Sequence, residues 1–170
     1  LILPIAHRNV ESISFLRLIH LRKIQRAEGL IPNQYDYQMY IMNLADKKIT
    51  PMTKDFNPSV QQTVWSKTDG QIYFTAENRD YISLYRMNPV NGKIQQLDAQ
   101  EDLVKSISLA DNAPVMAYYG QGAMNSDRLY TLDTKKGKTA LVEDLSKEIL
   151  KDVQLGECHR VIGLSGTPIY

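Results

Sequence analysis

A gapless repeat with a period of 45 residues constrains the fold of this chain more than any other feature. The segments that begin at Tyr40, Tyr85 and Tyr130 align over 13 residues, and successive starting positions differ by 45 residues. A regular period of this length predicts a fold built from repeated supersecondary units.

Each copy of the repeat predicts a strand, a tight turn and a second strand. The tyrosine and the apolar residue two positions later share one strand face, which we expect to be buried. An Asn or Asp then folds back onto the backbone to open the turn, and a glycine relieves positive φ four residues later. The shared columns are Tyr40/Tyr85/Tyr130, Met42/Met87/Leu132, Asn43/Asn88/Asp133, Lys47/Gly92/Gly137 and Lys48/Lys93/Lys138.

A second hairpin precedes the best-preserved copy. Asp69-Gly70 lies between apolar runs, which is a strong hairpin signal, and the strand after it places Ile72, Phe74 and Ala76 on one face. In the next copy Ser108 and Asp111 keep step with Ser66 and Asp69, but the turn is longer.

Two hairpins in about 45 residues form a four-stranded antiparallel sheet, the unit of a β-propeller blade. We therefore predict an all-β chain that forms a partial β-propeller of about two and a half blades. Full blades are expected at 60–98 and 104–142, and the outer half of a preceding blade at 38–53. The alternative is a β-sandwich whose strands resemble each other.

The blades at 38–142 leave two flanking segments. Residues 1–37 form an N-terminal extension, in which 11–28 place Phe15, Leu18 and Ile19 on one side of a helix. Alternation of Leu16, Leu18 and His20 also permits a strand. Residues 143–170 form a C-terminal segment, and its first part predicts a short helix or ordered loop with four apolar side chains inward. These are Leu145, Ile149, Leu150 and Val153.

Composition excludes several classes of partner. The 20 Lys and Arg residues nearly balance the 19 Asp and Glu residues, so the formal charge of +1 offers no field for nucleic acid. No apolar run reaches the roughly 18 residues that span a membrane. The single Cys158 cannot form an intrachain disulfide. The start at Leu1 fits a processed product or a piece of a longer chain.

Residues 64–76 (VWSKTDGQIYFTA) and 84–93 (LYRMNPVNGK) resemble the propeller repeats of the prolyl oligopeptidase family of serine peptidases. The nearest resemblance is to the bacterial dipeptidyl-peptidase IV branch, and it covers about 38–142. The repeats are also similar to periplasmic propellers related to TolB. In the peptidase family a propeller covers the mouth of an α/β-hydrolase domain that follows it in the chain.

The resemblance implies that this chain is the non-catalytic propeller portion of an exported serine peptidase. Its partners would be the hydrolase domain of the same parent chain and, as substrates of the parent, short peptides that the ring of blades admits. The parent would be a dipeptidyl peptidase or oligopeptidase in the periplasm or outside the cell. The alternative is a stand-alone TolB-like propeller that serves as a protein-interaction module.

No catalytic or cofactor-binding residue is assigned in this chain. A hydrolase nucleophile requires a Gly-x-Ser-x-Gly elbow, and the nearest segment, Gly163-Leu-Ser-Gly-Thr167, lacks the final glycine. Ser165 with His159 therefore has neither the orienting acid nor the scaffold of a triad.

Five further groups have a structural interpretation that outweighs a functional one. A basic stretch is expected to be a solvated surface, a tyrosine group to pack on one strand face, and one acidic group to form a polar blade connection rather than a Ca²⁺ site. A turn group is expected to form local ion pairs, although it could contact peptide in an intact enzyme, and three separated histidines do not predict zinc. The basic stretch is Arg17/His20/Arg22/Lys23/Arg26, and the tyrosine group is Tyr35/Tyr37/Tyr40. The acidic group is Asp98/Glu101/Asp102, the turn group is Glu77/Arg79/Asp80, and the histidines are His7/His20/His159. No metal site is proposed.

The number of blades predicts how the chain associates. Closed propellers typically use 4 to 8 blades, so an arc of two and a half exposes at least one blade flank. We expect some of Ile72, Phe74 and Ala76 to be exposed on that flank, and the isolated chain to self-associate through it.

Overall fold

The computed structural model describes residues 4–5, 12–18, 37–159, 161–162 and 168–169, and almost all of its regular structure is β-strand. The only helix among these residues is α2 (Lys147–Leu150). The strands are β1 (Pro4–Ile5), β2 (Ser12–Leu18), β3 (Tyr37–Asn43), β4 (Ile49–Pro51), β5 (Ser59–Trp65), β6 (Ile72–Asn78), β7 (Tyr81–Met87), β8 (Ile94–Leu97), β9 (Leu103–Leu109), β10 (Val115–Gln121), β11 (Arg128–Asp133), β12 (Lys138–Asp144), β13 (Val161–Ile162) and β14 (Pro168–Ile169).

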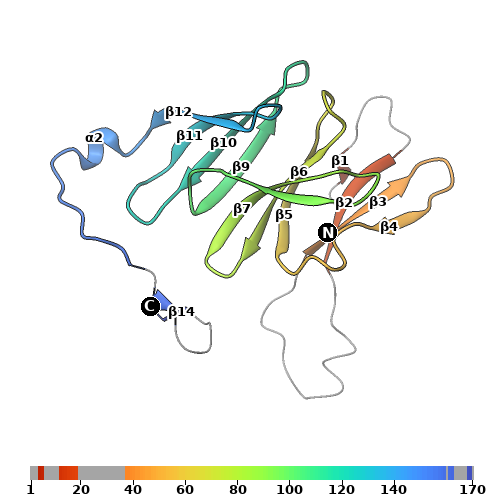
Figure 1. The fold of residues 1–170 in the computed structure, drawn as a ribbon, viewed down its shortest axis with the longest axis horizontal. Coiled ribbons are helices and arrows are strands. Elements are labelled where there is room, and N and C mark those ends of the chain that lie inside the picture. The colour runs from red at the N-terminus through yellow and green to blue at the C-terminus, as the bar shows by residue number, and fades with distance from the viewer. Residues whose placement is uncertain (1–3, 6–11, 19–36, 160, 163–167, 170) are drawn as a thin grey trace.

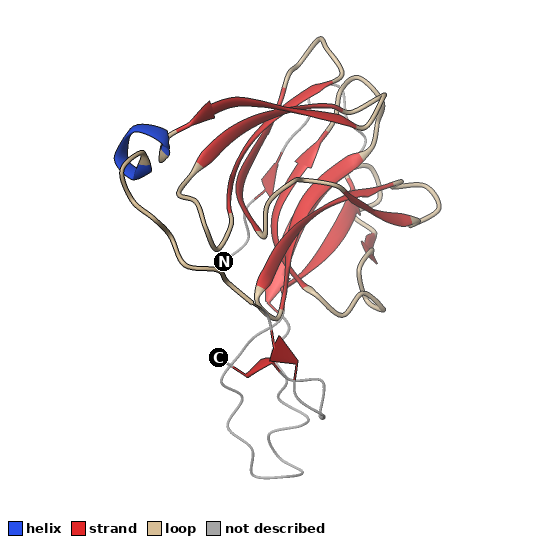
Figure 2. Cartoon of the chain, turned by 60° about the vertical axis from the view of Figure 1, so that its left-hand side comes forward, coloured by secondary structure: helices blue, strands red, loops and turns tan. Residues whose placement is uncertain are grey.

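Three four-stranded antiparallel units follow one another along the chain (Figure 1). We call them the first blade (β1–β4), the middle blade (β5–β8) and the third blade (β9–β12). The middle and third blades are joined by a short parallel contact of β7 with β9 at Ile82 and Leu103. Figure 2 shows the sheets as separate twisted layers. The all-β prediction is therefore confirmed.

The first blade contains two strands that the sequence analysis assigned to the N-terminal extension. β2 pairs along its whole length with β3, from Ser12 opposite Asn43 to Leu18 opposite Tyr37. The helical interpretation is thus wrong over Ser12–Leu18, and the alternation of apolar residues was the better signal. Pairing with a neighbouring strand decides between two patterns that the local sequence permits. The rest of the predicted helix lies outside the described residues.

The 45-residue repeat is preserved in the pairing register. Tyr40 lies opposite Pro51, Tyr85 opposite Gln96 and Tyr130 opposite Leu141. Each tyrosine lies on the third strand of its blade and pairs with the residue 11 positions later, on the fourth strand. The predicted equivalence of the three tyrosines is confirmed.

The turns after these strands also follow the predicted design. The side-chain Oδ1 atoms of Asn43, Asn88 and Asp133 each accept hydrogen bonds from two backbone N–H groups in the turn, at 2.8 to 3.4 Å. Lys47, Gly92 and Gly137 have φ of 60°, 70° and 69°. Lys47 thus adopts a backbone conformation that its two glycine counterparts occupy without steric cost.

The core consists of two apolar layers between neighbouring blades. Between the first and middle blades, Met39 packs with Phe74 and Tyr85, whose rings stack at 5.3 Å. Between the middle and third blades, Tyr73 and Leu84 pack with Tyr118 and Tyr130, whose rings stack at 5.2 Å. The middle and third blades therefore each pack their tyrosine face against the preceding blade.

The burial of the tyrosine face depends on that neighbour. Tyr85 and Tyr130 are buried as predicted, whereas Tyr40 and Met42 are half-buried because they lie on the face of β3 opposite Met39. Their face of the first blade has no described blade against it.

The flank prediction named the wrong residues. Ile72, Phe74 and Ala76 belong to the middle blade and are fully buried against the first. Apolar side chains are exposed instead on the outer face of the third blade, among other places, and there Val115 and Tyr119 are 37% and 42% exposed.

The inward packing predicted for the C-terminal segment is also wrong. Leu145, Ile149 and Val153 are exposed, and α2 projects from the third blade at the left of Figure 1. No described element covers it. No helix in the described part of the chain is long and apolar enough to cross a membrane.

Candidate functional site

The antiparallel order of strands places the loops at two ends of the arc. One end, which we call the connection end, carries the turns between second and third strands and the connections from one blade to the next. The other, the turn end, carries the remaining turns. Residues 79–80 and 98–102 both lie at the connection end, since the backbone N–H of Ile82 donates to the carbonyl oxygen of Asp102 at 2.9 Å. Two candidate groups that are separate in the sequence are therefore neighbours.

A polar pocket of about 570 Å³ opens at the connection end. Its walls come from the connection between the middle and third blades, from the β10–β11 loop and from the start of β7. Residues with titratable or amide side chains in this pocket are Tyr81, Gln96, Asp98, Gln100, Glu101, Asp102, Asn125, Arg128 and Cys158.

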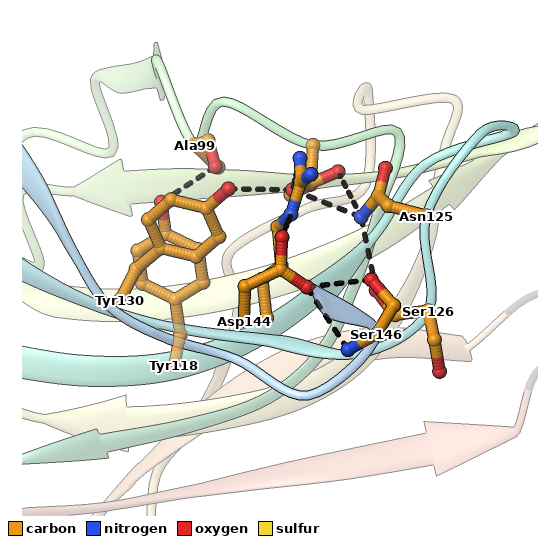
Figure 3. Close-up of polar contacts among 9 residues, drawn as sticks. Ala99, Tyr118, Asn125, Ser126, Tyr130, Asp144 and Ser146 are labelled. Atoms are coloured by element: carbon orange, nitrogen blue, oxygen red, sulfur yellow. Dashed lines mark hydrogen bonds and ion pairs between the residues drawn. The ribbon is translucent and has the colours of Figure 1, made fainter. Parts of the chain in front are cut away.

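Glu101 is the buried centre of this pocket, with a side chain only 3% exposed. Its Oε1 accepts a hydrogen bond of 2.5 Å from the Tyr130 hydroxyl and lies 3.5 Å from Arg128 Nη1. Asn125 Nδ2 donates to both carboxylate oxygens, at 3.2 and 3.3 Å. Figure 3 shows Tyr130 and Asn125 on two sides of this cluster. These contacts join the connection between the middle and third blades to β11 and to the β10–β11 loop.

A second carboxylate extends the network to the end of the third blade. Arg128 Nε donates to Asp144 Oδ2 at 2.8 Å, and Asp144 Oδ1 accepts from the backbone N–H and the hydroxyl of Ser146 at 3.0 and 2.5 Å (Figure 3). The hydrogen bond from Ser146 lowers the pKa of Asp144, and the bond to Asp144 raises the pKa of Arg128. Asp144 and Arg128 are therefore held in their ionised forms.

The hydroxyl of Tyr130 remains a hydrogen-bond donor in this setting. Burial raises its pKa above the ordinary value of 10, and the hydrogen bond to Glu101 raises it further. The neighbouring Tyr118 donates to the carbonyl oxygen of Ala99 at 2.5 Å, and burial raises its pKa as well.

Two glycines permit the close approach of Glu101 to the end of β10. A Cβ atom at Gly120 would lie 2.7 Å from Glu101 Cγ, and one at Gly122 would lie 2.7 Å from Asn125 Oδ1 and 2.9 Å from Glu101 Oε2. The sequence analysis did not single out Gly-Gln-Gly at 120–122. A pair of glycines at the end of a predicted strand was the available signal.

The three carboxylates considered for Ca²⁺ do not converge. Asp98 accepts from the backbone and side-chain amides of Gln100 at 3.2 and 2.7 Å, while Glu101 is held in the network above. No group of three or more metal-ligating side chains occurs in the region that the structure describes.

The other predicted groups are only partly described. Glu77 accepts from Gln61 Nε2 at 3.1 Å, and residues 79–80 form a two-residue turn in which Arg79 has φ of 62°. The ion pairing expected within this group stays a prediction. Tyr37 and Tyr40 lie on opposite faces of β3 because their positions differ by an odd number, so the single-face prediction is wrong.

Of the pair Ser165 and His159, only His159 is among the described residues. His159 is exposed, with Nε2 3.1 Å from Glu157 Oε2. Arg17 lies in β2. The remaining residues of these groups lie outside the described part of the chain, and they are His7, His20, Arg22, Lys23, Arg26, Tyr35 and Ser165.

The chemistry of the connection end suits binding and support rather than bond cleavage. Glu101 and Asp144 already accept hydrogen bonds from fixed donors, and Arg128 is shared between them. Such a network holds the loops around the pocket in one arrangement.

No family model matches the sequence, and no curated protein matches it significantly. Solved structures do match. TolB from Acinetobacter baumannii is 16% identical with a TM-score of 0.60, over 83% of this chain and 32% of that chain. The β-propeller domain of the Trilobed protease from Pyrococcus furiosus is 16% identical with a TM-score of 0.59, over 85% and 38%. The Pyrococcus horikoshii acylaminoacyl peptidase is 18% identical with a TM-score of 0.61, over 89% and 21%.

These similarities define the class of the fold. The chain has the fold of a partial β-propeller, as the repeat predicted, and it resembles propellers of peptidases and TolB alike. It spans between about a fifth and two fifths of the length of these structures.

Proposed function

We propose that this chain is the non-catalytic propeller portion of an exported serine peptidase of the dipeptidyl-peptidase IV type. In this proposal it restricts peptide access to a hydrolase domain of the same parent chain. The observation that carries the proposal is the likeness of the arc of blades to the propellers of two peptidase structures. The hairpin and strand at 64–76 and 84–93 add the sequence resemblance described above.

The connection end has the physical properties that a size filter needs. A filter must keep its rim in place while peptides pass, and here Glu101 and Arg128 tie the blade connection to β11 and to Asp144. Neutral and charged donors together make such a buried network rigid. Short peptides would pass the rim as extended chains, whereas folded proteins would be excluded by size.

The experiment is activity profiling of the full reading frame that contains residues 1–170. A fluorophosphonate probe should label a serine outside residues 1–170, and the Ser165→Ala variant should label equally well. The parent protein should cleave dipeptidyl chromogenic substrates but should not cleave folded proteins. The isolated 170-residue chain should show neither labelling nor cleavage, because it lacks a nucleophile elbow. Absence of labelling in the full reading frame would contradict the peptidase proposal.

A stand-alone TolB-like interaction module is the second candidate. It is favoured by the similarity to TolB and by the exposed apolar side chains of the third blade. A reading frame that adds blades but no labelled serine would support this candidate. Both candidates place the protein in the periplasm or outside the cell, and cell fractionation with an antibody against residues 37–159 tests that location.

A further inference from the structure

The turn end carries a second and larger cavity that the proposed function does not use. It has a volume of about 840 Å³, within the range of small-molecule sites, and lies between the turns of the middle and third blades. Its polar lining comes from both blades. The lining residues are Thr68, Asp69, Gln71, Arg86, Asn88, Asn91, Lys93, Gln95, Asn112, Pro114, Thr134 and Lys135.

Positive charge predominates in this cavity, which we call the turn groove. Arg86 and Lys93 come from the middle blade and Lys135 from the third, while Asp69 is the only carboxylate among the lining residues. Neither Lys93 nor Lys135 forms an ion pair with a described carboxylate. Two lysines that form no ion pair with a described carboxylate therefore border one cavity from opposite blades, and Asp133, which interacts electrostatically with Lys135, is not among the lining residues.

The single carboxylate does not offset these cations fully. Asp69 Oδ1 accepts from the backbone N–H of Gln71 at 3.0 Å, and Oδ2 accepts from the Tyr73 hydroxyl at 2.8 Å. Although burial by itself raises the pKa of Asp69, the hydrogen bonds from Ser66, Gln71 and Tyr73 lower it overall. Asp69 is thus an ionised group whose oxygen atoms are occupied by the protein.

Several neutral donors in the turn groove are fixed and unused. The Oδ1 atoms of Asn88 and Asn91 accept backbone hydrogen bonds within the turn, at 2.8 and 3.0 Å, which leaves their Nδ2 amides as donors. Thr134 also borders the groove, but its Oγ1 is buried and interacts with the Tyr73 hydroxyl. The groove therefore presents the two Nδ2 amides of Asn88 and Asn91 as donors beside its cations.

We propose that the turn groove binds a small multivalent oxyanion, with carboxylate or phosphoryl groups contacting Lys93 on one wall and Lys135 on the other. Cations and amide donors pair with such oxygens through charge-assisted hydrogen bonds. A ligand with more than one anionic group contacts both walls at once, because the two lysines come from different blades. This site is distinct from the connection-end pocket and does not depend on a peptidase role.

The repeat supplies a matched control for the lysines. Lys48 and Lys138 occupy the same column as Lys93, in the equivalent turns of the first and third blades, and neither lines the turn groove. Replacing both removes the same charge as replacing Lys93 and Lys135. A general attraction of anions to a basic surface would respond equally to both double variants.

Calorimetric titration of the 170-residue chain with citrate and with pyrophosphate at low ionic strength tests the proposal. At least one should bind, and the Lys93→Ala/Lys135→Ala variant should lower its affinity by about tenfold or more. The Lys48→Ala/Lys138→Ala variant should bind within about twofold of the unmodified chain, because surface charges elsewhere act weakly. Binding of citrate alone or pyrophosphate alone would identify the carboxylate or the phosphoryl group as the anion recognised.

Side-chain amide signals in NMR spectra locate the bound anion independently of the affinities. The signals of Asn88 and Asn91 should shift on titration, whereas that of Asn43, the equivalent of Asn88 in the first blade, should not. The proposal is overturned if neither anion binds at millimolar concentration, if both double variants lose affinity equally, or if the shifts occur away from the groove.

Discussion

At the residue scale, one turn of the repeat is built with a residue that does not suit its backbone. Lys47 has φ of 60°, where its counterparts are Gly92 and Gly137. A non-glycine residue in this region costs about 1 kcal/mol. We expect Lys47→Gly to stabilise the chain by up to about 1 kcal/mol and Gly92→Lys to destabilise it by a similar amount. Urea unfolding measures both changes, with Lys48→Gly as a control that should not stabilise. Equal effects of Lys47→Gly and Lys48→Gly would contradict the explanation.

Also at the residue scale, the buried Tyr130 predicts a loss of stability in alkali. Burial and the bond to Glu101 raise the pKa of Tyr130 in the folded state above its unfolded value near 10. Its contribution is therefore fully present below pH 10 and is lost as the pH rises through the folded pKa. Urea midpoints between pH 8 and 11 should fall less steeply for Tyr130→Phe than for the unmodified chain. Tyr119→Phe, an exposed control, should keep the original slope, and an unchanged slope for Tyr130→Phe would disprove the assignment.

Asp144 predicts the opposite dependence on pH, a loss of stability in acid. The hydrogen bond from Ser146 lowers the pKa of Asp144 below its ordinary value of 3.8. The stabilisation is present above the unfolded pKa and disappears as the pH falls below about 4. Asp144→Asn should therefore make unfolding between pH 2 and 5 less dependent on pH. Circular dichroism during acid titration measures this change, and an unaltered acid profile for Asp144→Asn would contradict the explanation.

At the element scale, the end of β10 is shaped by the approach of the Glu101 side chain from the connection between the middle and third blades. A methyl group at Gly120 would lie within 2.8 Å of both Glu101 Cγ and Cβ, and Cβ cannot move without its backbone. Gly120→Ala should cost about 1–3 kcal/mol of stability, as overpacking does elsewhere. Gly156→Ala, where nothing lies within 4 Å, should be nearly neutral. Adding Glu101→Ala to Gly120→Ala should recover part of the loss in a double-mutant cycle, and full stability of Gly120→Ala alone would refute the contact.

At the scale of the whole molecule, the apolar layers between blades explain where the chain should associate. The third blade exposes Val115 and Tyr119 on the face that, in the middle blade, receives the tyrosine of its neighbour. We expect the isolated chain to self-associate through this flank. Sedimentation at several concentrations should show a rising mass, and Tyr119→Lys should lower it. Val90→Lys, at a turn residue that is 93% exposed, introduces the same charge away from the flank and should have no effect. A monomer at every concentration would contradict the expectation.

The sequence by itself determined the repeat, the hairpin turns and the all-β class. These follow from local chemistry, because an Asn or Asp side chain, a glycine at positive φ and alternating apolar residues act within a few residues of each other. The register of Tyr40, Tyr85 and Tyr130 could be predicted for the same reason. Gly-Gln-Gly at 120–122 was visible in the sequence, but its purpose depends on Glu101, which comes from a different connection.

Only the tertiary structure decided which faces are buried and which polar residues meet. Ile72, Phe74 and Ala76 are buried because they pack in one cluster with Met39 of β3 in the first blade. Glu101, Arg128 and Asp144 are far apart in the sequence, and they form a network because antiparallel blades return their loops to the same end. Burial and side-chain convergence depend on neighbouring blades, and that information is not contained in any single segment.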